Sequence, residues 1–212
     1  SVALAGLGAD IIALQEVDEF VSRSGGIDQA KWLGEKLGME SAFGSFMDFQ
    51  GGRYGLAILS KFPIEHSEIW RLADGNEPRV ALAVRIRPTF GNSTALNTPI
   101  TFVVVHFDWV GDDAFRFTQA SQTIEHIQSL DSITPWVVLG DFNDTPTSRT
   151  MQAFFDIGKN AVKRAGESMT FPANAPNKEI DFIIAGPPVR WKNVRSVVVD
   201  EPTASDHLPV AA

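Results

Sequence analysis

Three polar clusters in this chain carry the groups that hydrolysis of a phosphate ester requires. They are Gln15-Glu16, Gly140-Asp141-Phe142-Asn143 and Ser205-Asp206-His207-Leu208-Pro209. Between them they supply carboxylates, a carboxamide and an imidazole, which can align water, hold a hard divalent cation and move a proton. The clusters are far apart in sequence, and each ends an apolar, strand-like run, as Gln15-Glu16 closes the run from Ile11 to Leu14. This arrangement predicts a single site at one rim of a sheet.

Asp141 and Asn143 are two residues apart, so on an extended strand both side chains face the same way while Phe142 turns into the core. In that arrangement Asp141 aligns or deprotonates the attacking water, and Asn143 holds a phosphoryl oxygen as charge develops. The alternative is an Asx turn after a buried strand, because Gly140 and residues 143–146 are turn formers. Both interpretations can hold, since a turn would expose the pair.

The segments Leu14-Gln15-Glu16, Gly140-Asp141-Phe142-Asn143, Ile180-Asp181-Phe182 and Ser205-Asp206-His207 resemble the signature segments of the endonuclease/exonuclease/phosphatase superfamily. Residues 54–63 and 103–107 also match the places where that family has a core strand and a histidine strand. The group includes pancreatic-type deoxyribonucleases, apurinic endonucleases, neutral sphingomyelinases, inositol polyphosphate phosphatases and deadenylases. The resemblance implies an α+β fold, a four-layer α/β/β/α sandwich of two mixed sheets flanked by helices.

The resemblance also implies roles for residues of these segments. Glu16 is expected to be the principal ligand of Mg²⁺ or Mn²⁺, with Asp206 directed toward the same metal, since such cations take oxygen ligands. His207 is expected to act in the in-line hydrolysis, and Asp181 to hydrogen-bond its far ring nitrogen, which fixes the tautomer. The alternative for Glu16 is a surface glutamate that caps a strand.

Two further residues are candidates for binding the phosphate. His106 ends the apolar run of residues 101–105 and is expected to bind phosphate or stabilise the transition state; as a core histidine bonded to a carbonyl it would serve packing alone. Arg79 begins a strand and is expected either to clamp a phosphate bidentately or to belong to a solvated charge stripe with Arg85 and Arg87. Asn76 and Tyr54 are weaker candidates.

Apolar runs bounded by Gly, Pro, Asn or Asp predict strands at 10–17, 54–60, 79–87, 100–107, 136–140, 180–185 and 195–199. Helices are expected at 29–37 and 113–130, the second capped by Asp112 or Asp113, and from a Ser148 cap to residue 155. Loops are expected at 73–78, 88–99 and 172–178. Strands outnumber helices without alternating with them, which favours two packed sheets over a doubly wound sheet.

One domain is expected over residues 1–212, and the resemblance adds an expectation about its start. Residues 1–8 read as the last turns of a helix, so the family's first strand, which carries a metal-site asparagine, is expected to be missing from this sequence. No apolar stretch reaches the roughly 20 residues that a membrane span needs. Cysteine is absent, which excludes disulfides and thiolate ligands.

The composition favours some substrates over others. A net charge of −8 disfavours a nucleic-acid partner held by a broad basic face, although bound cations would cancel part of that charge. The first hypothesis is therefore a Mg²⁺- or Mn²⁺-dependent phosphoesterase acting on a soluble phosphodiester or phosphomonoester, as a monomer. The alternatives are a nuclease with the same chemistry and a non-catalytic binding module that retains the fold.

Overall fold

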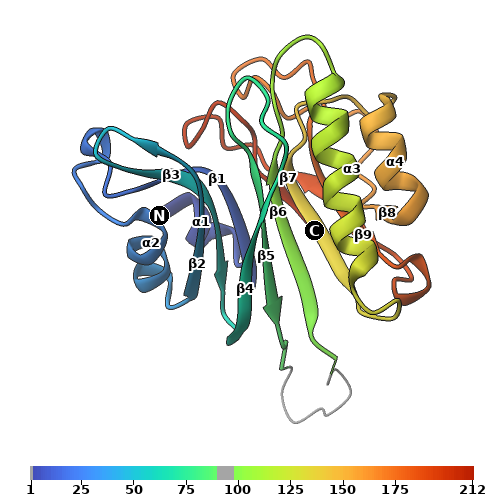
Figure 1. The fold of residues 1–212 in the computed structure, drawn as a ribbon, viewed down its shortest axis with the longest axis horizontal. Coiled ribbons are helices and arrows are strands. Elements are labelled where there is room, and N and C mark those ends of the chain that lie inside the picture. The colour runs from blue at the N-terminus through green and yellow to red at the C-terminus, as the bar shows by residue number, and fades with distance from the viewer. Residues whose placement is uncertain (1, 90–97) are drawn as a thin grey trace.

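The computed structural model describes residues 2–89 and 98–212, which form two packed sheets with helices on both outer faces. Figure 1 shows the layers in order: α2, a small sheet, a large sheet, and the helices α3 and α4. The predicted α+β sandwich is confirmed. The larger sheet is mixed, whereas the strands of the smaller sheet pair only antiparallel within the described ranges, so the expectation of two mixed sheets is wrong for the smaller one.

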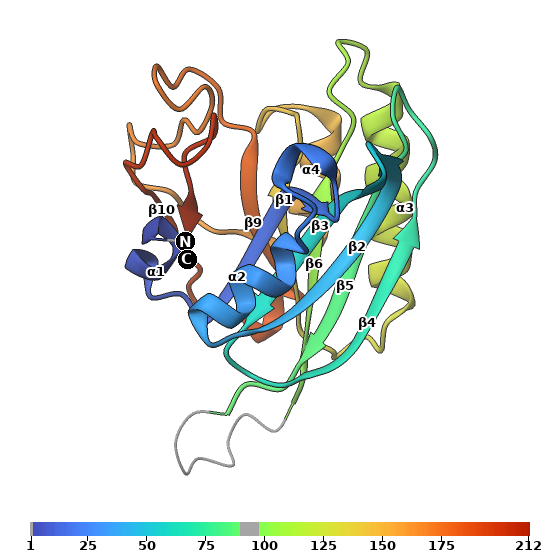
Figure 2. The ribbon, with the colours of Figure 1, turned by 90° about the vertical axis from the view of Figure 1, so that its left-hand side faces the viewer.

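The small sheet has the order β1-β3-β2, formed by Ile11–Glu19, Gly52–Ser60 and Glu40–Phe49. Helix α2 (Gln29–Leu37) covers its outer face (Figure 2). The helix begins where the Asp28 carboxylate accepts a bond from the Lys31 amide, and it ends at Gly38, whose left-handed backbone suits glycine. A short helix α1 (Val2–Leu7) precedes β1.

The large sheet has the order β4-β5-β6-β7-β9-β8. Among its described strands, only β6 and β7 pair in parallel. Its strands span Ile64–Arg71, Val80–Ile86, Ile100–His106, Trp136–Asp141, Asp181–Gly186 and Lys159–Asn160. A separate pair, β10 (Val197–Val198) and β11 (Val210–Ala211), lies on either side of the His207 segment in the chain.

The central strands are buried on both faces because each face packs against a different layer. In β5, Leu82 and Val84 contact the small sheet, while Ala81 and Ala83 belong to the core beneath the helices. This is the period of two that a strand imposes on its side chains. It also explains the nearly continuous apolar sequence of β5 and β6.

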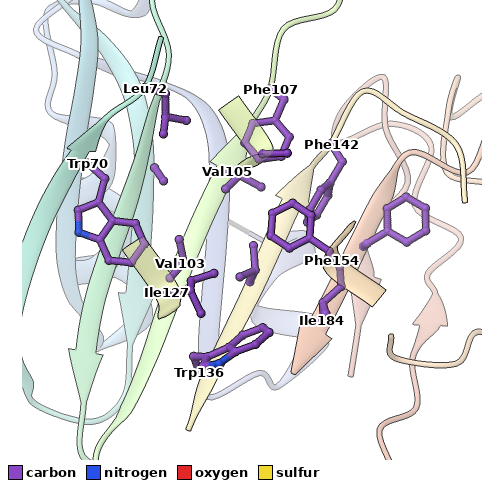
Figure 3. Close-up of a cluster of buried hydrophobic side chains, with 14 of the residues drawn as sticks. Trp70, Leu72, Val103, Val105, Phe107, Ile127, Trp136, Phe142, Phe154 and Ile184 are labelled. Atoms are coloured by element: carbon purple, nitrogen blue, oxygen red, sulfur yellow. The ribbon is translucent and has the colours of Figure 1, made fainter. Parts of the chain in front are cut away.

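The helix-facing core is rich in aromatic rings (Figure 3). Helices α3 (Ala114–Ser129) and α4 (Arg149–Ile157) cover it, and Phe154 of α4 is fully buried against it. Ser148 caps α4 as predicted, by accepting a bond from the Met151 amide. No helix within the described part of the chain is both long and apolar enough to cross a membrane.

Four strands escaped prediction: the long strands β2 and β4 and the two-residue strands β8 and β11. Most residues of β4 are exposed, because β4 is an edge strand, and β2 mixes polar and apolar residues without clean alternation. The expected loop at 88–99 lies largely outside the described residues, which omit 90–97. Helix α3 starts at Ala114, whose amide donates to the Asp112 side chain, so Asp112 supplies the capping bond.

Candidate active site

Three of the predicted site residues lie in one row across the large sheet. His106, the last residue of β6, is in register with Asp141, the last residue of β7. Asp141 is in turn opposite Asp181, the first residue of β9. Residues in register on neighbouring strands project from the same face of a sheet, so strand pairing alone gathers one imidazole and two carboxylates.

Each member of this row is followed in the chain by a phenylalanine that anchors it. Phe107, Phe142 and Phe182 are all but completely buried in the helix-facing core. Their rings meet edge to face, with centroids 5.5 Å apart for Phe107 and Phe142 and 5.7 Å apart for Phe142 and Phe182. Because successive side chains alternate, the polar row is fixed on the opposite face, toward the small sheet.

His207 joins the row from the C-terminal segment. Its Nδ1 lies 2.9 Å from Asp181 Oδ2, and its Nε2 lies 3.8 Å from Asp141 Oδ2. The ring also packs against Phe171, with ring centroids 4.7 Å apart. Ligand atoms of Asp141, Asp181 and His207 all lie within 4.8 Å of one another, so these residues are close enough together to hold a metal ion.

Asp141 and Asn143 are held by a turn and not by an extended strand. Strand β7 ends at Asp141, Asn143 has a left-handed backbone (φ 51°), and its amide donates to Asp141 Oδ1 at 2.7 Å. The expectation that both side chains share a strand face is therefore wrong, and the Asx-turn alternative describes the geometry. The Asn143 side chain donates to the Phe107 carbonyl at 3.0 Å, which ties the turn to the end of β6.

Gly140 permits the close approach of β6 and β7 beneath this turn. A Cβ at this position would lie 2.1 Å from the Val105 carbonyl oxygen, and the backbone φ of 141° is one that other residues rarely adopt. The glycine before the site aspartate is thus a steric requirement of the sheet. Any larger residue there would push Asp141 away from His106.

The protonation states of these groups are set by burial and by their neighbours. Burial, followed by the charges of Arg79 and His207, lowers the pKa of His106 to about 3, so its ring is neutral at physiological pH. Burial and the nearby Asp181 carboxylate raise the pKa of Asp141 well above that of an ordinary aspartate. Burial alone would lower the pKa of His207, but the Asp181 hydrogen bond and the surrounding carboxylates outweigh it and raise the pKa to about 9.

Arg79 is buried beside this site, which excludes the solvated-stripe alternative. Its side chain is 2% exposed, whereas that of Arg85 is 52% exposed. One terminal nitrogen lies 3.1 Å from Glu77, the guanidinium packs over the Phe46 ring, and the buried Nε has no hydrogen-bond partner. Its charge acts on both His106 and Asp141. A buried guanidinium with a free N–H is suited to bind an oxyanion.

Glu16 and Asp206 lie outside the group of side chains within 4.8 Å of one another. Strand β1 continues three residues beyond Glu16, so the prediction that Glu16 closes the strand is wrong. Instead it sits at a register shift between β1 and β3, exposed, with a left-handed backbone (φ 58°). Burial, followed by the charge of Glu16, raises the pKa of Tyr54. Strand β1 packs against β6 and β7, the strands that end in His106 and Asp141.

Asp206 is exposed and adjacent to His207, whose pKa its charge helps to raise. The backbone amide of Asn76 donates to Oδ2 of the buried Asp108 at 2.6 Å, which fixes the position of Asn76. The metal, catalytic and phosphate-binding roles assigned to individual residues remain predictions.

Comparison with known proteins identifies the class to which this fold and site belong. The Endonuclease/Exonuclease/phosphatase family model matches residues 3–207, and the chain belongs to this family. The uncharacterized protein YbhP of Escherichia coli is 27% identical over 229 residues, which cover 97% of this chain and 83% of YbhP. Members of this family are generally hydrolases that act on phosphate esters.

Solved structures share the fold. A mannosyl-6-phosphatase of Bacteroides thetaiotaomicron superposes with a TM-score of 0.77 at 21% identity, covering 98% of this chain and 87% of that one. The catalytic domain of human Nocturnin, solved with a bound sulfate, gives a TM-score of 0.72 at 21% identity, covering 96% and 79%. At such identities the likeness establishes the fold alone.

Some residues of the site carried little sequence signal. Lys163, which donates to the main chain of Asp181, lies in a segment that reads only as a basic cluster. Phe171, against the His207 ring, lies in a Pro- and Asn-rich loop region. The repeated order of a polar residue followed by phenylalanine, at 106, 141 and 181, was the available signal for the row, since it marks strand ends with one face buried.

Proposed function

We propose that this protein hydrolyses a phosphate ester by in-line attack of water, on a small or medium-sized phosphodiester or phosphomonoester. The observation that carries the proposal is the convergence of His106, Asp141, Asp181 and His207 from three strands and the C-terminal segment. This face thus contains a neutral imidazole, a carboxylate whose pKa is raised by burial, and an imidazole whose pKa lies above neutrality. Groups with such separated pKa values suit acid and base roles.

The residues of the row divide these roles. The raised pKa of Asp141 allows its carboxylate to bind a proton near neutral pH. Asp141 therefore aligns the attacking water and accepts its proton. His207 is protonated and a quarter exposed, so it donates to a phosphate oxygen as charge develops, while Asp181 holds the ring. Neutral His106, Asn143 and the buried guanidinium of Arg79 contact the remaining phosphate oxygens.

The carboxylates near the site suit a divalent cation. Glu16 and Asp206 are exposed, and within the described residues neither forms an ion pair, so both offer oxygens to a hard ion. We assign them as the protein ligands of Mg²⁺ or Mn²⁺, which keep most of their coordination for water and phosphate oxygens. When bound, the cation would neutralise negative charge on the phosphate.

The charge distribution favours a substrate smaller than a nucleic acid. Many cationic side chains of the described residues are already paired, among them Arg23 with Asp18, Arg53 with Glu19, Arg116 with Asp144, and Lys163 with Glu179. They therefore offer little charge to a long phosphate backbone, which is held by neutralising many phosphates. The nuclease alternative predicts cleavage that falls steeply with salt.

A substrate screen tests the proposal. The protein is assayed with Mg²⁺, with Mn²⁺ and with EDTA against a chromogenic phosphodiester, phosphomonoesters including sugar phosphates, inositol phosphates, sphingomyelin and DNA. We expect turnover of a soluble ester that EDTA abolishes and that Asp141→Asn reduces strongly. An Arg85→Ala variant, altered at an exposed side chain of β5, the strand next to β6, is the matched control. Absence of turnover of every substrate with metal present would favour the non-catalytic binding module.

A further inference from the structure

Lys163 is a buried lysine next to the site that the proposed chemistry does not use. Its side chain is 3% exposed, and its ammonium lies 4.3 Å from the centre of the Phe182 ring. It donates to the Glu179 carboxylate and to the Asp181 main-chain carbonyl, both at 2.7 Å. A buried ammonium is costly to desolvate, so its retention here calls for a reason beyond packing.

The position of Lys163 follows from the edge of the large sheet. Strand β8 pairs with β9 through Lys159 and Asn160, and the Ala161 amide extends the ladder by donating to the Ile183 carbonyl at 2.8 Å. The chain then departs, because the Val162 amide donates to the Val194 carbonyl instead. Continued register would place residue 163 beside Asp181, where the Lys163 side chain supplies the bond that a strand amide would have made.

The same segment leads to the other half of the Asp181–His207 pair. Val162 forms a parallel bridge with Arg195, and its carbonyl accepts from the Ser196 amide at 3.0 Å. Residues 197–198 form β10, which pairs with β11 directly after the His207 segment. The segment around Lys163 therefore connects the strand that carries Asp181 with the strand pair that flanks His207.

We propose that Lys163 is a positioning residue, which fixes the main chain of Asp181 and thereby the hydrogen bond between Asp181 and His207. Glu179, two residues before Asp181, balances the ammonium charge. The ion pair and the bond to the Asp181 carbonyl therefore both hold the segment that leads into β9. A free Asp181 carbonyl at a sheet edge would let the carboxylate shift. The short Nδ1–Oδ2 contact of 2.9 Å would then not be held.

The kinetic part of this inference rests on the proposed function, and the spectroscopic part does not. Lys163→Met keeps the apolar part of the side chain over Phe182 but removes the ammonium. We expect kcat to fall about 10-fold with little change in KM, which is the lower end of the range for residues that orient a ligand or catalytic group without contacting the substrate. By ¹⁵N-histidine NMR, the His207 Nδ1 proton bonded to Asp181 should exchange with water faster than in the wild type. A role in stability alone would leave that proton unchanged.

Two further variants keep the test decisive. Lys163→Met strands the Glu179 carboxylate, so Lys163→Met/Glu179→Gln removes both charges and should restore folding without restoring kcat or the proton signal. Lys159→Met is the matched control, because the Lys159 ammonium also holds a carbonyl, that of Trp191 at 2.5 Å, on the same segment but at the far end of β9. Lys159→Met should retain wild-type kcat and the His207 proton.

The outcomes separate this inference from the proposed function. A folded double variant with normal kcat and a normal His207 proton would overturn the role of Lys163. An inactive wild type would refute the proposed function alone, and the proton exchange of the variants would still decide the role of Lys163. Loss of the proton signal in Lys159→Met as well would also overturn it, since the effect would then not be specific to the Asp181 carbonyl.

Discussion

Removing the His207 ring tests whether this imidazole acts on the reaction or only fills space. Its Nδ1 is held by Asp181 at 2.9 Å, which aligns the ring, and its Nε2 lies 3.8 Å from Asp141. A positioned acid or base contributes about 10²- to 10⁴-fold, so His207→Ala should reduce kcat on that scale and leave KM nearly unchanged. Asp181→Asn leaves the ring but removes the orienting charge and should lose about 10- to 100-fold.

The two residues should behave as one unit. Without the ring, the Asp181 carboxylate has nothing to orient, so the double variant should be scarcely slower than His207→Ala. Steady-state kinetics on the best substrate from the screen, with kcat and KM determined separately, measure this, and thermal unfolding confirms that each variant folds. His126→Ala, which removes a ring stacked on Trp70 in the α3 layer, is the control and should keep wild-type kcat. Additive losses for His207 and Asp181, or normal turnover of His207→Ala, would refute the reasoning.

Three other predictions follow from the geometry. Glu16→Gln should weaken Mg²⁺ binding in calorimetric titration with little effect on unfolding, and unchanged affinity would exclude Glu16 as a ligand. Arg79→Lys should raise KM and lower kcat together because a point charge replaces a planar fork, whereas Arg85→Lys should change neither. The folded pKa of His207, about 9, exceeds the ordinary 6.5, so its contribution to stability should be full below pH 6.5 and disappear as the pH rises through 9. Chemical denaturation at pH 6 and pH 10 should show this loss in the wild type and not in His207→Gln.

The sequence by itself determined two kinds of element: a helix with one apolar and one polar face, and strands that are apolar on both faces. Helix α2 runs over the predicted Gln29–Leu37, because an aspartate cap and a terminal glycine mark its ends. The central strands β5, β6 and β7 were visible as apolar runs, since burial between two layers leaves little choice of residue. The clusters ending in Asp141 and His207 likewise indicated the chemistry before their positions were known.

Only the tertiary structure decided how these groups meet. The left-handed backbones of Glu16 and Asn143, the burial of Arg79 and the role of Lys163 carry no local signature, because each depends on a neighbour far along the chain. The exposed edge strand β4 was missed for the same reason, as its place is set by pairing with β5 and not by its own pattern. Strand register placed His106, Asp141 and Asp181 in one row, and register is a property of paired strands that no single segment encodes.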